Sequence, residues 1–247
     1  EVTLLGQNVN SYNHDGRKFP TLLESVAKVS GLKRIRYTSP HPQDISIELL
    51  EVMSKYENIC NSIHLPLQSG SDRILKRMNR TYTRNHFIDL AKMIRKKLPN
   101  SGISTDIIVG FPGETEEDFL NTIKVMEEVK FDSAFTFKYS PRKGTKAIEY
   151  EDRVTEDEKQ KRLEKVIKLQ KSHTSLRNQS FIGKVENVLI EKVSKRNPAK
   201  WAGRTDSNKW VIFDKKSAKI KDMVPVLITE SKDITLHGKI MNEVKAA

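Results

Sequence analysis

Apolar and polar residues alternate along most of the chain in a pattern that predicts strands separated by helices. Apolar runs of strand length occupy residues 2–5, 35–37, 63–67, 103–109 and 134–139. Between them, apolar residues recur at the spacing of amphipathic helices, over residues 22–29, 47–55, 73–78, 85–98 and 116–129. Because a right-handed crossover helix joins parallel neighbours, this alternation predicts an α/β fold with a partial parallel (β/α) barrel.

The pattern changes in the last third of the chain. A long helix rich in Lys and Glu is predicted over residues 155–179, and its capping signal is Thr155 followed by Glu158; Thr115 and Asp118 form the same signal before the preceding helix. After Gly183, short β-like runs follow one another without a helical period. We therefore predict a part-barrel domain, residues 1–180, that ends in a connecting helix, residues 155–180, and a small all-β barrel, residues 181–247.

Charge supports an interaction with a polyanion. The chain has 44 Lys and Arg against 32 Asp and Glu, a formal net charge of +12. Residues 181–247 hold 14 basic and 8 acidic residues, a net of +6, which is half the surplus in about a quarter of the length. Such a surplus favours nucleic acid as the partner, and the β module is the better candidate for binding it. The alternative is a solvated basic surface with no partner.

Other sequence features narrow the class of protein. No apolar run reaches the length of a membrane span, and no signal-peptide pattern opens the chain, so we expect no membrane partner. Cys60 is the only cysteine, which fits a reducing compartment. No group of His, Cys and Asp has the spacing of metal ligands, and no glycine-rich nucleotide loop is present.

Polar residues follow each predicted strand of the part-barrel. Ligands of parallel β/α folds gather at the carboxyl ends of the strands, so these residues are candidates for a binding site. Asp106 lies within a strand, where a buried carboxylate is costly unless it is bonded or faces a ligand. Gln68 closes another strand and can face a ligand or bond a neighbouring backbone. We interpret His41 and His64 as structural histidines, neither bases nor metal ligands.

These polar segments carry a resemblance to a known family. The segments are LGQNVNSY (5–12), SPHP (39–42), HLPLQSGS (64–71), KRMNR (76–80), TDIIVGFPGET (105–115) and, near the end, GRTDSN (203–208) with VIF (211–213). In this order they resemble the MiaB family of radical S-adenosylmethionine tRNA methylthiotransferases, whose last part is a TRAM module. The resemblance covers essentially the whole chain.

The resemblance implies a binding site for S-adenosylmethionine and one for RNA. For the cofactor it implies contacts from Gly6, Gln7, Asn8, Gln68, Ser69, Arg80 and Asp106. Arg80 would pair with the methionine carboxylate, although it can also belong to a solvated helix end. On the substrate side it implies Ser39, His41, Tyr139 and Arg142, and for RNA contact Arg204, Lys209 and Trp210. A core position for Trp210, which alternates with Ile212, is the alternative.

The resemblance also implies what the chain lacks. Members of the family hold a [4Fe–4S] cluster on a Cys-x-x-x-Cys-x-x-Cys loop after the first barrel strand, and a second cluster in a preceding domain. Cys60 has no such spacing. Because a cluster needs several thiolate ligands, we expect the chain to be a C-terminal piece of the enzyme that lacks the first strand and the cluster loop, and to be inactive alone.

For the parent enzyme, the resemblance implies methylthiolation of carbon 2 of N6-isopentenyladenosine beside the anticodon of tRNA. One S-adenosylmethionine would supply the methyl group and another the radical. The expected partner is the anticodon stem-loop, and the expected location is bacterial cytoplasm or, alternatively, a mitochondrion.

Three alternatives remain: the same chemistry on threonylcarbamoyl-adenosine or on a ribosomal-protein aspartate, a non-catalytic RNA-binding protein, and a metal-independent barrel enzyme such as an aldolase. The last would need a catalytic Lys or paired carboxylates, which the strand ends do not offer.

Overall fold

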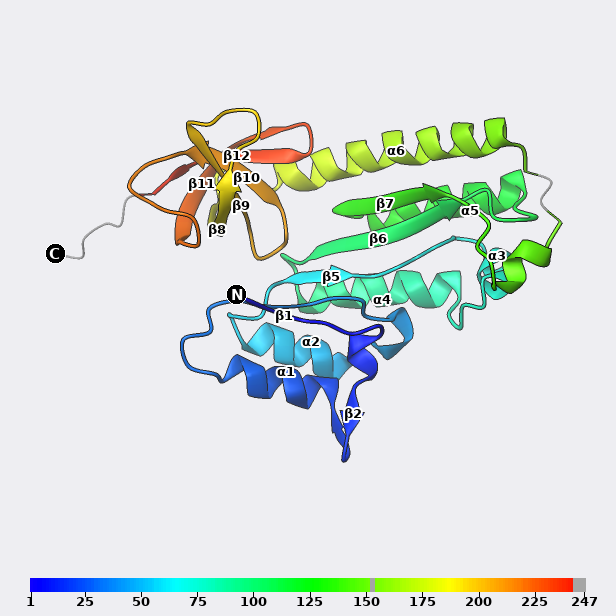
Figure 1. The fold of residues 1–247 in the computed structure, drawn as a ribbon, viewed down its shortest axis with the longest axis horizontal. Helices are drawn as coiled ribbons and strands as arrows, with labels where there is room; N and C mark the ends of the chain where they lie inside the picture. The colour runs from blue at the N-terminus through cyan, green and yellow to red at the C-terminus, as the bar shows by residue number, and fades with distance from the viewer. Residues whose placement is uncertain (152–153, 242–247) are drawn as a thin grey trace.

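The computed structural model describes residues 1–151 and 154–241. Residues 242–247 of the predicted β module lie outside this range. Figure 1 shows an elongated layer of strands and helices with a small β-barrel at one end, joined by the long helix α6 (Glu156–Gln179). Within the described ranges, no helix is both long enough and apolar enough to cross a bilayer.

The strands of the two main sheets in the larger part are parallel, as the alternating pattern predicted. β1 (Val2–Leu4) pairs with β4 (Ile35–Tyr37), and β5 (Ser62–His64), β6 (Gly102–Val109) and β7 (Ser133–Lys138) form a second sheet in that order. A parallel bridge between Ile35 and Ile59 links β4 to the segment that leads into β5. The strands therefore continue one another in the way a part-barrel requires, and the predicted fold class is confirmed.

Helices cover one face of these strands. They are α1 (Phe19–Ala27), α2 (Ile47–Lys55), α3 (Asp72–Arg77), α4 (Arg84–Lys97), α5 (Glu116–Val129) and α6. Alternate strand residues such as Ile63, Ile103 and Ile107 are fully buried against them in one apolar core. The intervening residues point to the opposite side, which we call the open face of the sheet.

Short elements complete this part of the chain. A hairpin of β2 (Asn13–His14) and β3 (Arg17–Lys18) precedes α1, and three 3-10 helices lie in loops: η1 (Val9–Ser11), η2 (Pro42–Asp44) and η3 (Lys146–Glu149). Both predicted capping boxes are present, at Thr115 with Asp118 and at Thr155 with Glu158. Each satisfies two backbone N–H groups that a helix start leaves unpaired.

The last part is a closed five-stranded barrel, with a strand order β10-β12-β11-β8-β9. Its strands are β8 (Val185–Val193), β9 (Lys200–Arg204), β10 (Trp210–Asp214), β11 (Met223–Lys232) and β12 (Thr235–Ile240). Val188, Val211 and Phe213 are fully buried in its own apolar core, which is separate from the first. Closure removes exposed strand edges, so a module of this size has no unpaired edge to protect.

The barrel docks on the amino ends of the parallel strands. Backbone carbonyls of Arg204 and Thr205 accept hydrogen bonds from the buried Arg34 guanidinium at 3.0 and 2.7 Å. A Cβ added to Gly102, at the start of β6, would lie 2.2 Å from the carbonyl oxygen of Ser207. The β9–β10 turn and the strand ends are thus in direct contact, and the carboxyl ends of the strands point away from the barrel (Figure 1).

Candidate functional site

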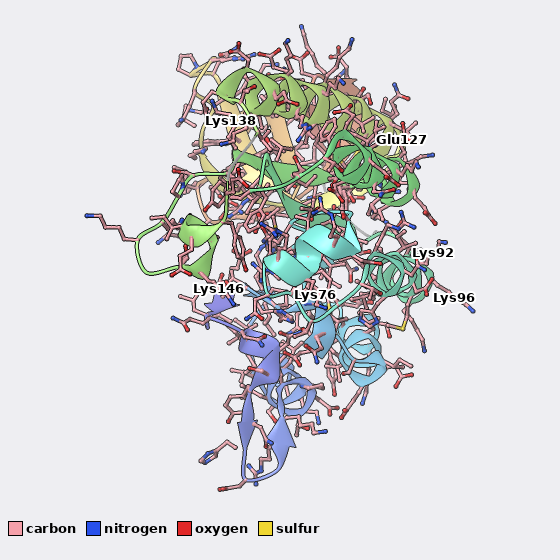
Figure 2. All side chains as sticks on the ribbon, turned by 90° about the vertical axis from the view of Figure 1, so that its right-hand side faces the viewer. Lys76, Lys92, Lys96, Glu127, Lys138 and Lys146 are labelled. Atoms are coloured by element: carbon pink, nitrogen blue, oxygen red, sulfur yellow. The ribbon has the colours of Figure 1, made fainter. Side chains whose placement is uncertain are left out.

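Three strand-to-loop junctions leave their strands through the same backbone conformation. Ser39 after β4, Gln68 after β5 and Gly110 after β6 have φ angles of 55°, 64° and 71°. Left-handed conformations are costly for residues with a Cβ and concentrate at functional sites. All three lie at the carboxyl ends of the strands, which Figure 2 shows face on, with Lys76 on α3 and Lys146 on η3 around them.

The middle of the open face holds a polar group of side chains. Asp106 on β6 and His64 on β5 lie side by side, with 3.2 Å between the carboxylate Oδ2 and the imidazole Nε2. The Nδ1 of His64 is 3.0 Å from the hydroxyl of Ser104. The side chains of His64 and Asp106 are 25% and 26% exposed. The face can therefore present a partly desolvated carboxylate to a ligand.

The backbone of Gln68 is bonded to the strand that carries Asp106. The backbone N–H of Gln68 donates to the carbonyl of Asp106 at 2.8 Å, and Ile108 donates back to Gln68 at 2.9 Å. Burial raises the pKa of the Tyr82 hydroxyl to about 12; the Arg80 charge opposes this rise and the Asp106 charge adds to it. The backbone bonds place Gln68 beside the strand that carries Asp106, and the Tyr82 hydroxyl donates to the carbonyl of Pro66, two residues before Gln68, at 2.8 Å.

Arg80 is not a solvated helix end. It follows the left-handed Asn79, and its N–H donates to the carbonyl of Leu75 at 2.9 Å. The Nε of Arg80 is buried and has no hydrogen-bond partner among the described residues; the same holds for Arg77. A buried guanidinium N–H without a partner is costly, and an anionic ligand would satisfy it.

The loop after β1 is tied to the loop after β4. Asn8 donates to the carboxylate of Asp44 at 2.7 Å, and Asn10 exchanges hydrogen bonds with the backbone of His41 at 2.8 and 3.1 Å. The side-chain oxygen of Asn8 is buried without a partner in the part of the chain that the structure describes. Gly6 lies in the same loop beside the exposed Gln7.

Histidine 41 packs on the same tyrosine that lies beside Arg80. Its ring makes an edge contact with Tyr82, with centroids 5.8 Å apart, and its Nδ1 accepts from the N–H of Gln43. The expectation that it is a structural histidine agrees with these contacts. His41 and Ser39 both follow β4, so they lie at the carboxyl ends of the strands, which we call the rim. The expected substrate side begins there.

Tyr139 and Arg142 follow β7 at the same rim. The ring of Tyr139 makes an edge contact with Phe111, with centroids 5.1 Å apart, and its hydroxyl is buried without a partner among the described residues. Arg142 is exposed, and its carbonyl accepts from Thr145. The two residues thus lie near one another in sequence and at the rim, but only Tyr139 offers a buried unpaired group.

One residue of the expected cofactor set does not line the site. Ser69 is fully buried, and its hydroxyl accepts from the N–H of Ser71 at 3.2 Å. It therefore shapes the loop after β5 and cannot touch a ligand at the surface, which corrects the expected cofactor contact. The neighbouring Gly70 is needed there because a Cβ would lie 2.5 Å from the backbone of α5.

A second candidate site is a groove between α6 and the β-barrel, with a volume of about 1060 Å³. It is strongly basic, and Asp233 is the acidic residue among those that line it. Its cationic residues are Lys171, Lys192, Lys195, Arg196, Lys200 and Lys232. Clustered cations in a groove attract a phosphate backbone by counterion release.

Trp210 lines this groove and is half-buried. The ammonium of Lys192 lies 4.3 Å from its ring centroid, and the Arg204 guanidinium lies 5.4 Å from it. An aromatic ring among cations is the arrangement that stacks single-stranded bases. Arg204 itself is not among the residues that line the groove, and its guanidinium is bonded to Glu191 at 2.6 Å and to Asn208 at 2.9 Å.

The expected RNA contact of Lys209 is wrong. Its side chain is buried, and the ammonium lies 2.8 Å from Asp132 and 2.9 Å from the side-chain oxygen of Asn178. A lysine that is enclosed and paired cannot reach a phosphate. Its charge joins the barrel to the rest of the chain.

The residues of this chain do not fit an iron–sulfur cluster. Cys60 is buried at the docking surface, with Sγ 3.5 Å from Nε of Arg34, and burial raises the pKa of its thiol. One thiol cannot supply the several thiolates that a cluster requires. Across residues 1–151 and 154–241, no group of three His, Cys, Asp or Glu side chains could hold a metal ion.

Sequence reasoning missed several residues of both sites. His64 was taken as structural, and neither Ser104 nor Tyr82 was singled out. The pairing of Ser62–His64 with the start of β6 brings His64 beside Ser104, and alternation along β6 brings Asp106 to the same face. The groove cations were missed because they come from four strands or turns and from α6. Their shared signal was the excess positive charge of the β module.

Comparisons with known proteins match both parts of the chain. The model of the Radical SAM superfamily matches residues 1–126, and that of the TRAM domain matches residues 179–241. A tRNA-2-methylthio-N(6)-dimethylallyladenosine synthase of Syntrophomonas wolfei is 48% identical over 246 residues, which are 98% of this chain and 55% of the relative. The protein of the same name from Acetivibrio thermocellus is 46% identical over 98% of this chain and 51% of its own length.

The chain thus spans about half the length of the curated relatives it matches. Among solved structures, a coproporphyrinogen III oxidase (HemN) from Escherichia coli, described as a radical SAM enzyme, gives a TM-score of 0.49 at 14% identity, covering 70% of this chain and 46% of that one. The matches in sequence confirm the family resemblance carried by the rim and tail motifs.

Proposed function

This chain belongs to the radical SAM superfamily and carries a TRAM domain, and from this premise we propose that the whole protein methylthiolates carbon 2 of N6-isopentenyladenosine beside the anticodon of tRNA. The similarity to the synthases, 48% over nearly the whole chain, is the observation that carries the proposal. The reaction replaces a C–H bond of the base with a C–SCH3 bond. Since the substrate is tRNA, we place the protein in the cytoplasm.

The rim at the carboxyl ends of the strands is the proposed site of S-adenosylmethionine. Unpaired buried groups at Asn8, Arg80 and Tyr139 support this proposal, because a ligand with an ammonium, a carboxylate and ribose hydroxyls would satisfy them. When bound, the cofactor would supply the methyl group and a radical that abstracts hydrogen. Arg80 would pair with the carboxylate, while Gln68 and Asp106 would contact the methionine or ribose.

The chain's own residues would orient the cofactor and shield it from water. Asp106 would accept hydrogen bonds from a ligand hydroxyl or ammonium on the open face, and Gln68 would fix the edge of the ligand at the end of β5. The loop of Gly6, Gln7 and Asn8, which Asn8 bonds to Asp44 at 2.7 Å, would close one side of the rim. The thiolates of a [4Fe–4S] cluster would have to come from outside residues 1–247, since the chain has one cysteine.

The basic groove is the proposed contact for the anticodon stem-loop. At the rim, Gly110 approaches Lys159 of α6, whereas the groove is lined by Lys171 and Ser175 of the same helix. At 1.5 Å per residue, the two sites are separated by roughly 20 Å along the helix axis. A folded stem-loop can span that distance, so its backbone could lie in the groove while its loop base reaches the rim.

The activity is tested by mass spectrometry of tRNA nucleosides. The complete gene that encodes this chain is expressed in a bacterial strain without its own synthase. The expected result is the conversion of isopentenyladenosine to its 2-methylthio derivative. Unchanged isopentenyladenosine would contradict the proposal, and a methylthio group on threonylcarbamoyl-adenosine instead would assign the other substrate.

The groove is tested by RNA binding of the chain itself. A Lys195→Ala, Arg196→Ala variant is compared with the unmodified chain, using an anticodon stem-loop that contains isopentenyladenosine. We expect the variant to bind more weakly and the slope of log K against log salt to fall by about 1 for each lost phosphate contact. Lys96→Ala is the matched control, an exposed lysine on α4 (Figure 2) that should change neither. Equal weakening in both variants would exclude the groove.

A further inference from the structure

The imidazole of His64 is held between two side chains of the neighbouring strand. Ser104 and Asp106 are two residues apart on β6, so both point to the open face, and the parallel register sets His64 directly beside Ser104. The contacts are 3.0 Å at Nδ1 and 3.2 Å at Nε2. Phe135 covers the ring edge from β7, with centroids 6.0 Å apart.

The two contacts select one tautomer of the ring. An ionised carboxylate only accepts hydrogen bonds, so the Nε2 that faces Asp106 must carry a proton. The neutral ring then has a lone pair on Nδ1, which accepts from the Ser104 hydroxyl. Ser104 therefore fixes which nitrogen donates, in the same way that the second partner of a histidine fixes its tautomer elsewhere.

One carboxylate oxygen of Asp106 remains available. Its Oδ2 is bonded to His64, whereas Oδ1 accepts no hydrogen bond from any described residue. The backbone N–H of Gln68, at the end of β5, donates to the carbonyl of Asp106 at 2.8 Å, which keeps Gln68 beside this residue. A carboxylate held by one oxygen, with the other facing a partly exposed surface, is oriented to accept from a ligand donor.

We propose that His64 is a positioning residue that aims the free oxygen of Asp106 at a donor group of the bound cofactor, a ribose hydroxyl or the methionine ammonium. This inference rests on the proposed cofactor site at the rim. His64 itself does not touch the ligand; it holds the carboxylate in one rotamer and Ser104 holds His64. Replacement of His64 should therefore lower the affinity for the ligand, because Asp106 is then no longer held in place.

Binding of S-adenosylhomocysteine to the chain, measured by calorimetry, tests this role. We expect His64→Leu to raise Kd about tenfold, because an unheld carboxylate must be ordered on binding. His64→Gln keeps an N–H donor near the position of Nε2 and should raise Kd only about twofold. Ser104→Ala should fall between them. His86→Leu, an exposed histidine on α4, is the control.

A double-mutant cycle separates positioning from a general structural effect. In a chain that carries Asp106→Asn, the further change His64→Leu should leave Kd unchanged, since the group it positions is already altered. A tenfold loss that persists in that background would overturn the inference, because His64 would then act independently of Asp106. Equal Kd values for the unmodified chain and His64→Leu would also overturn it while leaving the cofactor site standing. No binding by the unmodified chain would overturn both proposals.

The tautomer gives a readout that does not depend on ligand. Long-range proton–nitrogen spectra of the chain with labelled histidine should show His64 protonated on Nε2. In the Ser104→Ala variant this preference should weaken. A proton on Nδ1 in the unmodified chain would contradict the hydrogen-bond arrangement on which the inference depends.

Discussion

The ammonium of Lys209, on the β9–β10 side of the TRAM barrel, lies 2.8 Å from Oδ1 of Asp132, in the loop between α5 and β7. Both side chains are only 6% exposed. The same carboxylate accepts from Arg95 at 2.7 Å, from Arg177 at 3.2 Å and from the N–H of Ile103 at 2.9 Å. One buried anion thus ties together α4, α6, β6 and the barrel.

Removal of this charge should strongly destabilise the chain. Asp132→Asn leaves Lys209, Arg95 and Arg177 around a site without an anion, and breaking a buried ion pair on one side costs about 3–5 kcal/mol. Urea unfolding at neutral pH measures the loss. Asp15→Asn, an exposed aspartate in the β2–β3 turn, is the control and should stay within about 0.5 kcal/mol. Equal stability of the two variants would mean that the pairs contribute nothing.

The same carboxylate predicts a pH dependence of stability. Burial alone would raise the pKa of Asp132, but the charges of Lys209, Arg95 and Arg177 bring it down to about 2. Because the folded pKa lies below the unfolded value of about 3.9, the stabilisation is complete above pH 5 and is lost as the pH falls toward 2. The gap in unfolding free energy between the unmodified chain and Asp132→Asn should therefore shrink by about 1 kcal/mol between pH 5 and pH 3. A constant gap would show that another group carries the dependence.

Close contact between the domains predicts the effect of one added methyl group. In Gly102→Ala the new Cβ would lie 2.2 Å from the Ser207 carbonyl, so the β9–β10 turn must shift away from Arg34. Overpacking of this kind costs about 1–3 kcal/mol. Gly6→Ala, where the nearest atom would be 3.3 Å away at Val9, should cost less in the same urea titration. A larger loss of stability in Gly6→Ala than in Gly102→Ala would contradict the contact between the β9–β10 turn and the start of β6.

Glycine explains why part of the barrel could not be predicted from the sequence. β9 and β12 are difficult to predict because each contains a glycine, a residue that weakens the interior of a strand. In the closed barrel, Gly203 and Gly238 lie where a Cβ would be 2.3 and 2.5 Å from the backbone of the neighbouring strand. The glycines permit closure, which is a property of the assembled barrel that no single strand reveals.

The part-barrel was more predictable than its site. Strands and helices of this part follow from local periodicity, and α2 and α5 begin and end at the predicted residues. The partners of Lys209 and His64 cannot be predicted from local periodicity. Asp132 and Asp106 are distant from them in sequence and reach them only through domain docking and strand register. A lysine in a polar, basic segment is predicted to lie at the surface unless its buried partner is known.

The last prediction concerns Trp210, where stacking and charge can be separated. If its ring stacks on an RNA base, Trp210→Ala should weaken the binding of single-stranded RNA by about 1–3 kcal/mol, with the salt dependence unchanged. Lys192→Ala, which removes the cation 4.3 Å from the same ring, should instead lower the salt slope by about 1. Trp210→Phe keeps an aromatic face and should retain most of the affinity. This variant is the control that separates a loss of stacking from a folding defect. Filter binding over a range of salt concentrations measures all three. If Trp210→Ala binds like the unmodified chain while Lys192→Ala does not, the groove acts by charge alone, and the ring belongs to the barrel's packing.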